Sequence, residues 1–191
     1  MKKKLIKLLL FFLISFQACA SNSIYEKKED WENNRIIFLD QSGQTVYEIT
    51  EEMGLIYNSI FLTNAKVYYI DNSYNLVEVN LENSHAEKRL SDVGCFCISN
   101  DNYYICVGKI FSDNRMFYTT CVPELFILNT FQKIEIEQAD YSFLENEFGI
   151  STYITFMERE NNFEISYNWE SVEPLFLLQL DITSKKIKKI K

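Results

Sequence analysis

Residues 35–50 read RIIFLDQSGQTVYEIT, and residues 66–80 read KVYYIDNSYNLVEVN. In each stretch a run rich in Ile, Val, Tyr or Phe is followed by a polar turn and then by a second apolar run. Runs of this kind, separated by Asn, Asp, Ser and Gly, are typical of β-hairpins. The two stretches align with one gap, which places Asp40 and Asp71 in corresponding turns. The sequence therefore predicts an internal repeat of antiparallel strands.

A second repeat extends this pattern to the end of the chain. Asn80, Asn129 and Asp181 each follow an apolar run and precede a turn and a charged strand. They recur roughly every 50 residues, a spacing that resembles that of β-propeller blades, which are four-stranded units of about 40 to 50 residues. No WD or kelch signature accompanies the spacing, so the resemblance is to the β-propeller class in general.

We therefore predict a single all-β domain over residues 35–191, made of antiparallel meander sheets in a partial β-propeller-like or stacked-sheet arrangement. About three repeat units fit, fewer than the four to eight blades of a closed propeller, and a β-sandwich is the alternative. Residues 175–180, which follow Pro174, are predicted to form a buried strand. Only residues 138–149 space their apolar side chains as a helix does.

The N-terminal 18 residues have the pattern of an export signal. A basic start precedes an apolar run that is too short to cross about 30 Å of hydrocarbon. The following letters FQAC, residues 16–19, resemble the lipobox of bacterial lipoproteins, although Phe and Gln depart from its usual first two residues. The resemblance implies a lipid on Cys19, a polar tether over residues 19–34 and a lipid-anchored location on the periplasmic or surface side of the cell envelope. Residues 18–20 also fit ordinary A-x-A cleavage, which would give a soluble periplasmic or secreted protein.

The composition excludes several classes of partner. The chain has 27 acidic and 19 basic residues and a formal net charge of −8. This balance argues against binding nucleic acid and against electrostatic docking on anionic lipid. No P-loop, GxGxxG or HExxH motif is present, so no cofactor or metal is predicted.

Four cysteines follow Cys19, and their spacing predicts how they are arranged. Cys95 and Cys97 share one face of a strand because they are two residues apart. Turns centred between residues 100 and 101 and between residues 113 and 114 would set Cys106 opposite Cys95 on one side and Cys121 on the other. A disulfide that includes Cys106 is then geometrically feasible. Buried thiols are the alternative, and a zinc site is disfavoured because the usual C-x₂₋₄-C knuckle is absent. The opposite face of this meander is also apolar, so both faces are expected to be covered.

No catalytic residue is predicted. His85 lies in a polar turn, and no serine has the glycines of a nucleophile elbow around it. Residues 71–82 nearly match a calcium loop, but Leu76 stands where the loop needs glycine. The paired acids at residues 51/52, 145/147 and 158/160 are more typical of solvated faces than of a carboxylate site.

The sequence therefore predicts an envelope lipoprotein that acts as a non-catalytic binding module for a protein or glycan partner. Trp31, Trp169 and the 12 tyrosines could line the binding surface. One alternative is an immunity-type lipoprotein that neutralises a toxin. The small size and acidity of the chain suit this role as well as they suit a binding module. A hydrolase with a carboxylate site is the less favoured alternative.

Overall fold

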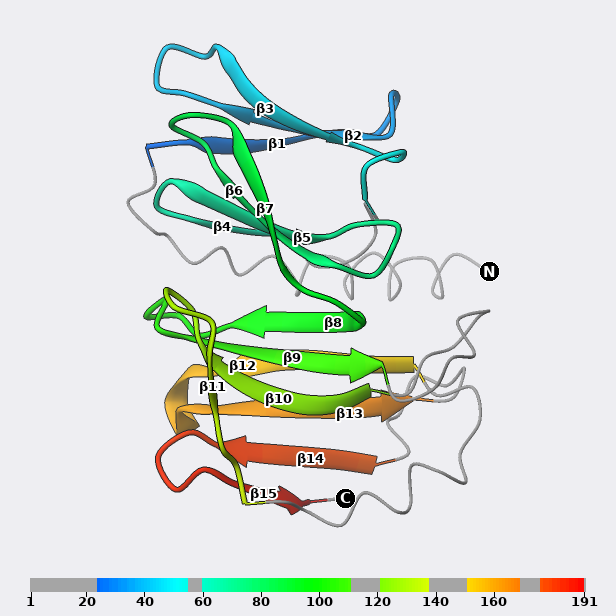
Figure 1. The fold of residues 1–191 in the computed structure, drawn as a ribbon, viewed down its shortest axis with the longest axis vertical. Helices are drawn as coiled ribbons and strands as arrows, with labels where there is room; N and C mark the ends of the chain where they lie inside the picture. The colour runs from blue at the N-terminus through cyan, green and yellow to red at the C-terminus, as the bar shows by residue number, and fades with distance from the viewer. Residues whose placement is uncertain (1–23, 55–59, 111–120, 138–150, 169–175, 191) are drawn as a thin grey trace, which may run out of the picture.

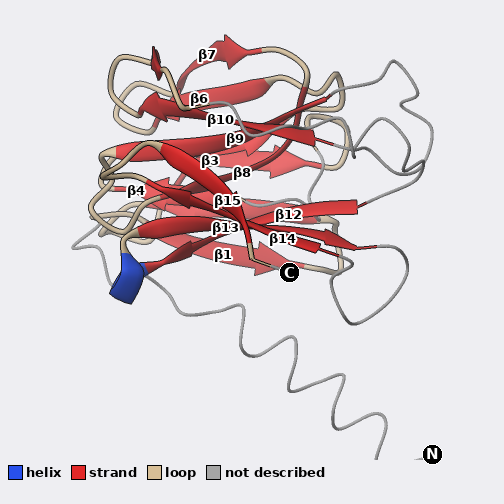
Figure 2. Cartoon of the chain, turned by 90° about the horizontal axis from the view of Figure 1, so that it is seen from below, coloured by secondary structure: helices blue, strands red, loops and turns tan. Residues whose placement is uncertain are grey.

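The computed structural model describes residues 24–54, 60–110, 121–137, 151–168 and 176–190. These residues form four antiparallel sheets, stacked one on another along the long axis of the molecule (Figure 1). Strands and short turns make up nearly all of the described chain, as Figure 2 shows, and no described helix is long and apolar enough to span a bilayer. The prediction of an all-β, stacked-sheet fold is confirmed, with four sheets where about three repeat units were expected. The helix expected at residues 138–149 lies outside the described residues.

The first sheet has three strands, β1 (Glu26–Asp30), β2 (Arg35–Leu39) and β3 (Thr45–Thr50). The second has β4 (Phe61–Thr63), β5 (Lys66–Ile70), β6 (Leu76–Asn80) and β7 (His85–Leu90). The third has β8 (Val93–Ile98), β9 (Tyr104–Ile110), β10 (Cys121–Ile127) and β11 (Gln132–Ile134). The fourth has β12 (Ser151–Met157), β13 (Asn162–Asn168), β14 (Phe176–Asp181) and β15 (Lys186–Lys189), with a 3-10 turn η2 (Glu158–Glu160) after β12.

Two strands bear directly on the sequence predictions. Strand β14 confirms the predicted C-terminal strand over residues 176–180, with Leu178 and Leu180 almost fully buried. Strand β1 lies in the segment that the sequence places in a polar tether, and it pairs along its whole length with β2. Its sequence, EKKED, has charged residues on both faces, so the apolar alternation that normally reveals a strand is missing.

Asparagine and aspartate side chains shape the turns that follow β2, β6 and β14. Asp40 Oδ1 accepts hydrogen bonds from the backbone N–H groups of residues 42 and 44 (2.8 and 2.9 Å). Asn80 Oδ1 accepts one from residue 82, and Asp181 Oδ1 accepts one from residue 183 (both 2.8 Å). Asx side chains commonly bond the backbone two residues further along, which fixes a tight turn. In the corresponding turn of the third sheet, Thr130 Oγ1 accepts from the N–H of residue 132 (3.3 Å). The repeat read from the sequence therefore has a structural basis.

The contacts of the first sheet show which blade strands it contains. Strand β3 starts beside the β6–β7 turn, where Ser84 Oγ donates to the backbone oxygen of Val46 (3.0 Å). It ends beside the β5–β6 turn, where Gly54 bridges to Asp71. The β2–β3 turn therefore lies beside the β6–β7 turn, so β2 and β3 correspond to β6 and β7, and β1 corresponds to β5. The first sheet lacks a counterpart of β4, and Asp40 corresponds to Asn80 rather than to Asp71, as the sequence alignment had placed it.

Three apolar cores fill the spaces between the four sheets. The first joins β2 and β3 to β5 and β6, through Ile36, Phe38, Ile49, Val67, Tyr69, Val77, Val79 and Leu81. The second joins the two middle sheets, through Tyr68, Ile70, Leu76, Val93, Phe96, Ile98, Ile105, Val107, Phe126 and Leu128. The third joins the third and fourth sheets, through Cys97, Cys106, Leu125, Ile154, Phe163, Ile165, Tyr167, Leu178, Leu180 and Ile182. The cysteine-bearing meander is thus covered on both faces, as predicted.

The outermost faces of the stack carry charged residues. On the first sheet Arg35 pairs with Asp30 (2.8 Å) and Glu48 (3.1 Å) on the face turned away from the second sheet. On the fourth sheet Lys186 and Lys188 are exposed. Stacked repeats need polar outer faces at their ends because no neighbour covers them.

The connections at the two ends of the stack differ in length. Long connections over residues 51–60, 111–120 and 169–175 leave β3, β9 and β13 at one end, which we call the loop end. The opposite end, which we call the turn end, has only short turns, at residues 40–44, 64–65, 81–84, 99–103, 128–131, 158–161 and 182–185. Short hairpin turns of about 2–5 residues are the usual connection, so the long ones mark the loop end as specialised.

The apolar cores predict a clear contrast between two neighbouring positions in the fourth sheet. Leu180→Ala should lower the free energy of unfolding by about 2–5 kcal/mol, because it leaves a cavity in the third core. Lys188→Ala, at an exposed position on the adjacent strand, should change it by no more than about 0.5 kcal/mol. Urea unfolding of the two variants and the wild type measures both values, and equal effects would contradict the assigned faces.

Candidate functional site

The cysteine cluster is present, but its register differs from the predicted one. Cys97, not Cys95, lies directly opposite Cys106, and Cys95 lies opposite Gly108. The prediction that Cys95 faces Cys106 is therefore wrong by two residues. A shift of two residues keeps every side chain on the same face, so Cys97 takes the place opposite Cys106 that was predicted for Cys95.

The turn between β8 and β9 explains this register. The N–H of Ser99 donates to the backbone oxygen of Tyr104 (2.9 Å), which centres the turn between residues 101 and 102. Asp101 Oδ1 holds the turn by accepting from Ser99 Oγ (2.5 Å) and from the N–H of residue 103 (3.0 Å). The hydrogen bonds of Asp101 therefore determine where the turn SNDN is centred, and the residue types in the turn do not reveal this position.

The other predicted neighbour of Cys106 is also displaced. Cys106 lies opposite Leu125, and Cys121 lies opposite Ile110 at the far end of the strand pair. The sequence reading assumed a short turn, but residues 111–120 separate β9 from β10. The predicted pairing of Cys106 with Cys121 is therefore also wrong.

Cys95, Cys97 and Cys106 are thiols rather than members of a disulfide, and the last two are buried. Since Ser99 and Tyr104 form a hydrogen-bonded pair, Cys97 and Cys106 form one too, two residues further along. Facing Cβ atoms are wider apart in such pairs, whereas a disulfide needs about 3.5–4.5 Å. Burial, with a smaller contribution from Cys97, raises the pKa of Cys106 well above its usual value, so this thiol is unsuited to nucleophilic chemistry.

The candidate catalytic and metal-binding motifs do not assemble. His85 is exposed at the start of β7, and the adjacent Ser84 uses its hydroxyl to bond the backbone of Val46. Asp71 is occupied by hydrogen bonds from residues 73 and 75, and strand β6 separates it from Glu82. Among the described residues no group of three or more His, Cys, Asp or Glu side chains is placed to hold a metal ion.

Glu78 is the one carboxylate that is buried within the described part of the chain, at 5% exposure. Its Oε1 atom lies 2.7 Å from Lys66 Nζ and 3.0 Å from Arg89 Nη2. Burial raises the pKa of Glu78, but the hydrogen bonds and charges of Arg89 and Lys66 outweigh it, so the pKa lies below its usual value. A carboxylate held ionised by two cations is a structural ion pair, not a general acid.

The same arginine joins the second sheet to the third. The guanidinium of Arg89 lies over the ring of Phe131, 5.3 Å from its centroid, and this ring is 6.4 Å from that of Tyr68. Phe131 has a positive φ of 52° in the turn where the chain reverses from β10 into β11. Its role is to fasten two sheets together, and the sequence offered no signal for it.

An exposed aromatic surface lies at the loop end of the first sheet. Trp31, in the β1–β2 turn, is 59% exposed, and Met53, just after β3, is 38% exposed. The turn is held firmly: Asp30 accepts from the side chain of Asn33 (2.9 Å), and Glu51 accepts from the side chain of Asn34 (3.2 Å). Large exposed apolar side chains on a rigid turn are a common mark of an interaction site.

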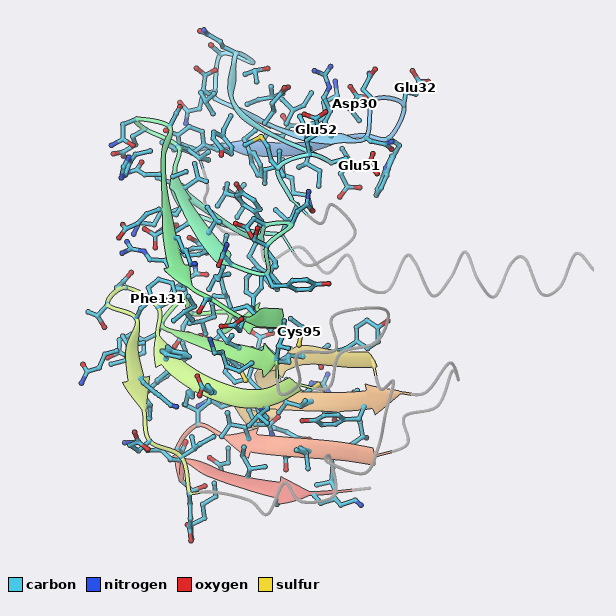
Figure 3. All side chains as sticks on the ribbon, turned by 45° about the vertical axis from the view of Figure 1, so that its right-hand side comes forward. Asp30, Glu32, Glu51, Glu52, Cys95 and Phe131 are labelled. Carbon is cyan, nitrogen blue, oxygen red and sulfur yellow. The ribbon has the colours of Figure 1, made fainter. Side chains whose placement is uncertain are left out.

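Carboxylates surround this surface. Figure 3 shows Asp30, Glu32, Glu51 and Glu52 at the same end of the first sheet. Hydrogen bonds from Asn33 and then Arg35 lower the pKa of Asp30, which is therefore ionised. The nearby cation, Arg35, is already paired with Asp30 and Glu48. In the described part of the chain neither Glu32 nor Glu52 takes part in an ion pair. The electrostatic potential around Trp31 is therefore negative.

We call Trp31, Glu32, Glu51, Glu52 and Met53 the Trp31 surface. Sequence reasoning had singled out Trp31 and the acid pair at residues 51/52, but separately. It missed Glu32 and Met53, and the predicted strand boundary at residue 35 left Trp31 in a tether. The other acid pairs are elsewhere: residues 158/160 are exposed at the turn end, and residues 145/147, like Trp169, lie outside the described residues.

Comparison with known proteins supports the fold and supplies no family. No family model and no curated protein matches the sequence. Among solved structures, the N-terminal domain of Nup159 matches with a TM-score of 0.61 and 13% identity, over 87% of this chain and 45% of that one. Hydrazine synthase from Kuenenia stuttgartiensis matches with a TM-score of 0.53 and 13% identity, over 87% and 45% of the two chains.

A third structure contains the same propeller in an assembly. It is the S. cerevisiae complex of Dbp5 bound to Nup159, Gle1, IP6 and ADP, which matches with a TM-score of 0.59 and 12% identity over 87% of this chain and 44% of that one. The chain thus spans less than half the length of these three solved structures. At this identity the likeness shows the fold alone: the protein has a β-propeller-like fold in the form of an open stack of four sheets.

The ion pairs of Glu78 predict how stability depends on pH. Glu78→Gln should lower the free energy of unfolding at pH 7 by about 1–3 kcal/mol, a value discounted because Lys66 and Arg89 remain partly exposed. The folded pKa of Glu78 lies below the ordinary value of 4.5. Its contribution is therefore complete above that value and is lost as the pH falls through the folded pKa.

Urea unfolding at pH 7 and at about pH 3 tests this, and the gap between variant and wild type should shrink in acid. Glu87→Gln is the matched control, because Glu87 also pairs with Arg89 but is exposed, so its loss should cost less than about 1 kcal/mol. A gap that stays constant with pH would contradict the assignment.

Proposed function

We propose that this protein is a lipid-anchored component of the cell envelope that acts as a non-catalytic binding module for a protein partner. The lipid is carried by Cys19, and the partner binds at the loop end. The observation that carries the proposal is the difference between the two ends of the stack. Long connections and the exposed Trp31 surface share one end, and short turns occupy the other.

A rigid stack with specialised loops at one end is the usual arrangement of a binding scaffold. Binding residues are found disproportionately on loops that a rigid scaffold positions. Here three apolar cores supply the rigidity. The buried carboxylate of Glu78 is fully engaged by two cations, so it supports a structural role and not a carboxylate-based hydrolase.

The position of β1 supports one orientation for the proposed anchor. Glu26, at the start of β1, pairs with Leu39, which leads into the turn at residues 40–44. The chain therefore enters the stack at the turn end. Residues 19–24 reach at most about 20 Å when fully extended, at about 3.3–3.6 Å per residue. A lipid on Cys19 would hold the turn end near the membrane and direct the loop end away from it, toward partners.

The anchor itself can be tested by metabolic labelling with a fatty-acid probe. The wild-type protein should be labelled, and Cys19→Ser should not, because the thiol is the attachment point. An unlabelled wild type with a mature N-terminus at Ser21 would show that A-x-A cleavage releases the protein, and would overturn this part of the proposal.

The binding end can be tested by photo-crosslinking in the native envelope. A photoreactive benzophenone amino acid in place of Met53 should give a crosslinked product of one defined mass, since Met53 lies in the Trp31 surface. The matched control is the same substitution at Tyr103, which is 47% exposed in the β8–β9 turn at the opposite end. Equal crosslinking from the two positions, or none from position 53, would contradict the proposal.

A further inference from the structure

We infer that the Trp31 surface binds an extended, lysine- or arginine-bearing segment of a protein partner. The inference rests on the proposed function and deepens it, because it names the chemistry of the partner. It draws on two independent features of the described residues, an exposed aromatic ring and an excess of negative charge around it.

The aromatic ring is exposed on a restrained turn. Trp31 is 59% exposed, which is the largest exposure among the described large apolar side chains. Its turn is restrained on both sides by the side-chain hydrogen bonds of Asn33 and Asn34. Tryptophan is the best aromatic partner for a Lys or Arg side chain placed over its face, and a restrained turn loses little backbone entropy on binding.

The negative charge around the ring favours a positively charged ligand. Glu32, Glu51 and Glu52 are all exposed, and Arg35 is neutralised by Asp30 and Glu48. A cationic side chain on Trp31 would therefore meet uncompensated carboxylates, which favour its approach and suppress anionic partners.

Met53 makes a protein segment a better fit than a free cation. Its exposed thioether adds an adaptable apolar contact beside the carboxylates, which suits the aliphatic stem of a Lys or Arg side chain. A hard divalent cation prefers oxygen ligands and would gain nothing from Trp31 or Met53, and the described residues show no cluster placed to hold a metal ion.

The order of β1–β3 allows an extended segment to lie here. The first sheet lacks the inner strand that the other sheets have, so the inner edge of β1 has no neighbouring strand among the described residues. This edge ends at Asp30, directly before Trp31. An extended segment beside β1 would therefore run into the Trp31 surface.

The experiment uses the mature chain with Trp169→Phe, so that Trp31 is the sole tryptophan. The probes are three synthetic decapeptides that alternate glycine with lysine, glutamate or serine. The lysine peptide should change the Trp31 fluorescence saturably, with an apparent Kd that rises with salt, and the other two should leave it unchanged. Calorimetry with Trp31→Ala should show binding about two- to fivefold weaker.

A double variant and its matched control test the carboxylates. Glu32→Gln/Glu52→Gln should weaken binding of the lysine peptide about three- to tenfold. The control is Glu82→Gln/Glu158→Gln, which removes the same charge at exposed positions of the turn end and should leave binding unchanged. Equal weakening by both pairs, or no response to the lysine peptide, overturns the inference.

The outcome is separable from that of the proposed function. If position 53 crosslinks to a partner but the lysine peptide does not bind, the binding role stands and the cationic chemistry fails. If the peptide binds at Trp31 but position 53 gives no product in the envelope, the binding role proposed for the loop end fails instead.

Discussion

The fold depends on the requirement that both faces of the two middle sheets be covered. Strand β6 directs Val77 and Val79 toward the first sheet and Leu76 toward the third, and β9 directs Ile105 toward the second sheet and Cys106 toward the fourth. A sheet that is apolar on both faces cannot face water, so it must lie between two others. Four sheets in a row satisfy this demand because the outer faces of the first and last carry charge. The ion pairs of Arg35 and the exposed lysines of β15 therefore let the two outer faces meet water, while the cores cover the inner faces.

The sequence predicted the fold class well because period-two alternation and Asx turns are local signals. The interval from Asn80 to Asn129 to Asp181 marks equivalent turns in three sheets, and it was read correctly. Asp40 was matched to Asp71 instead of Asn80, because the two hairpins share nearly the same local hydrogen bonds. Only contacts between sheets, such as that of Ser84 with Val46, distinguish one hairpin from the other, and no local pattern encodes them.

The candidate site was harder to predict for the same reason. Cys95, Cys97 and Cys106 were placed on the correct face, but a two-residue register shift, set by Asp101 within one turn, changed which of them are neighbours. Trp31 lies in the β1–β2 turn and Glu51 directly after β3, and their place at the same end of the sheet follows from the pairing of β1, β2 and β3. Charged residues on both faces of β1 concealed that strand, so the surface it supports could not be assembled from sequence alone.

The open stack also gives the molecule an uneven resistance to local opening. In a stack each sheet is stabilised by its nearest neighbours, so a terminal sheet has half the support of an internal one. The first sheet has three strands, one core and a charged innermost strand, which makes it the weakest cooperative unit of the described chain. It also carries Trp31 and Met53. A partner that orders this sheet would slow amide exchange there before anywhere else, so that binding and local folding are thermodynamically linked at the same place.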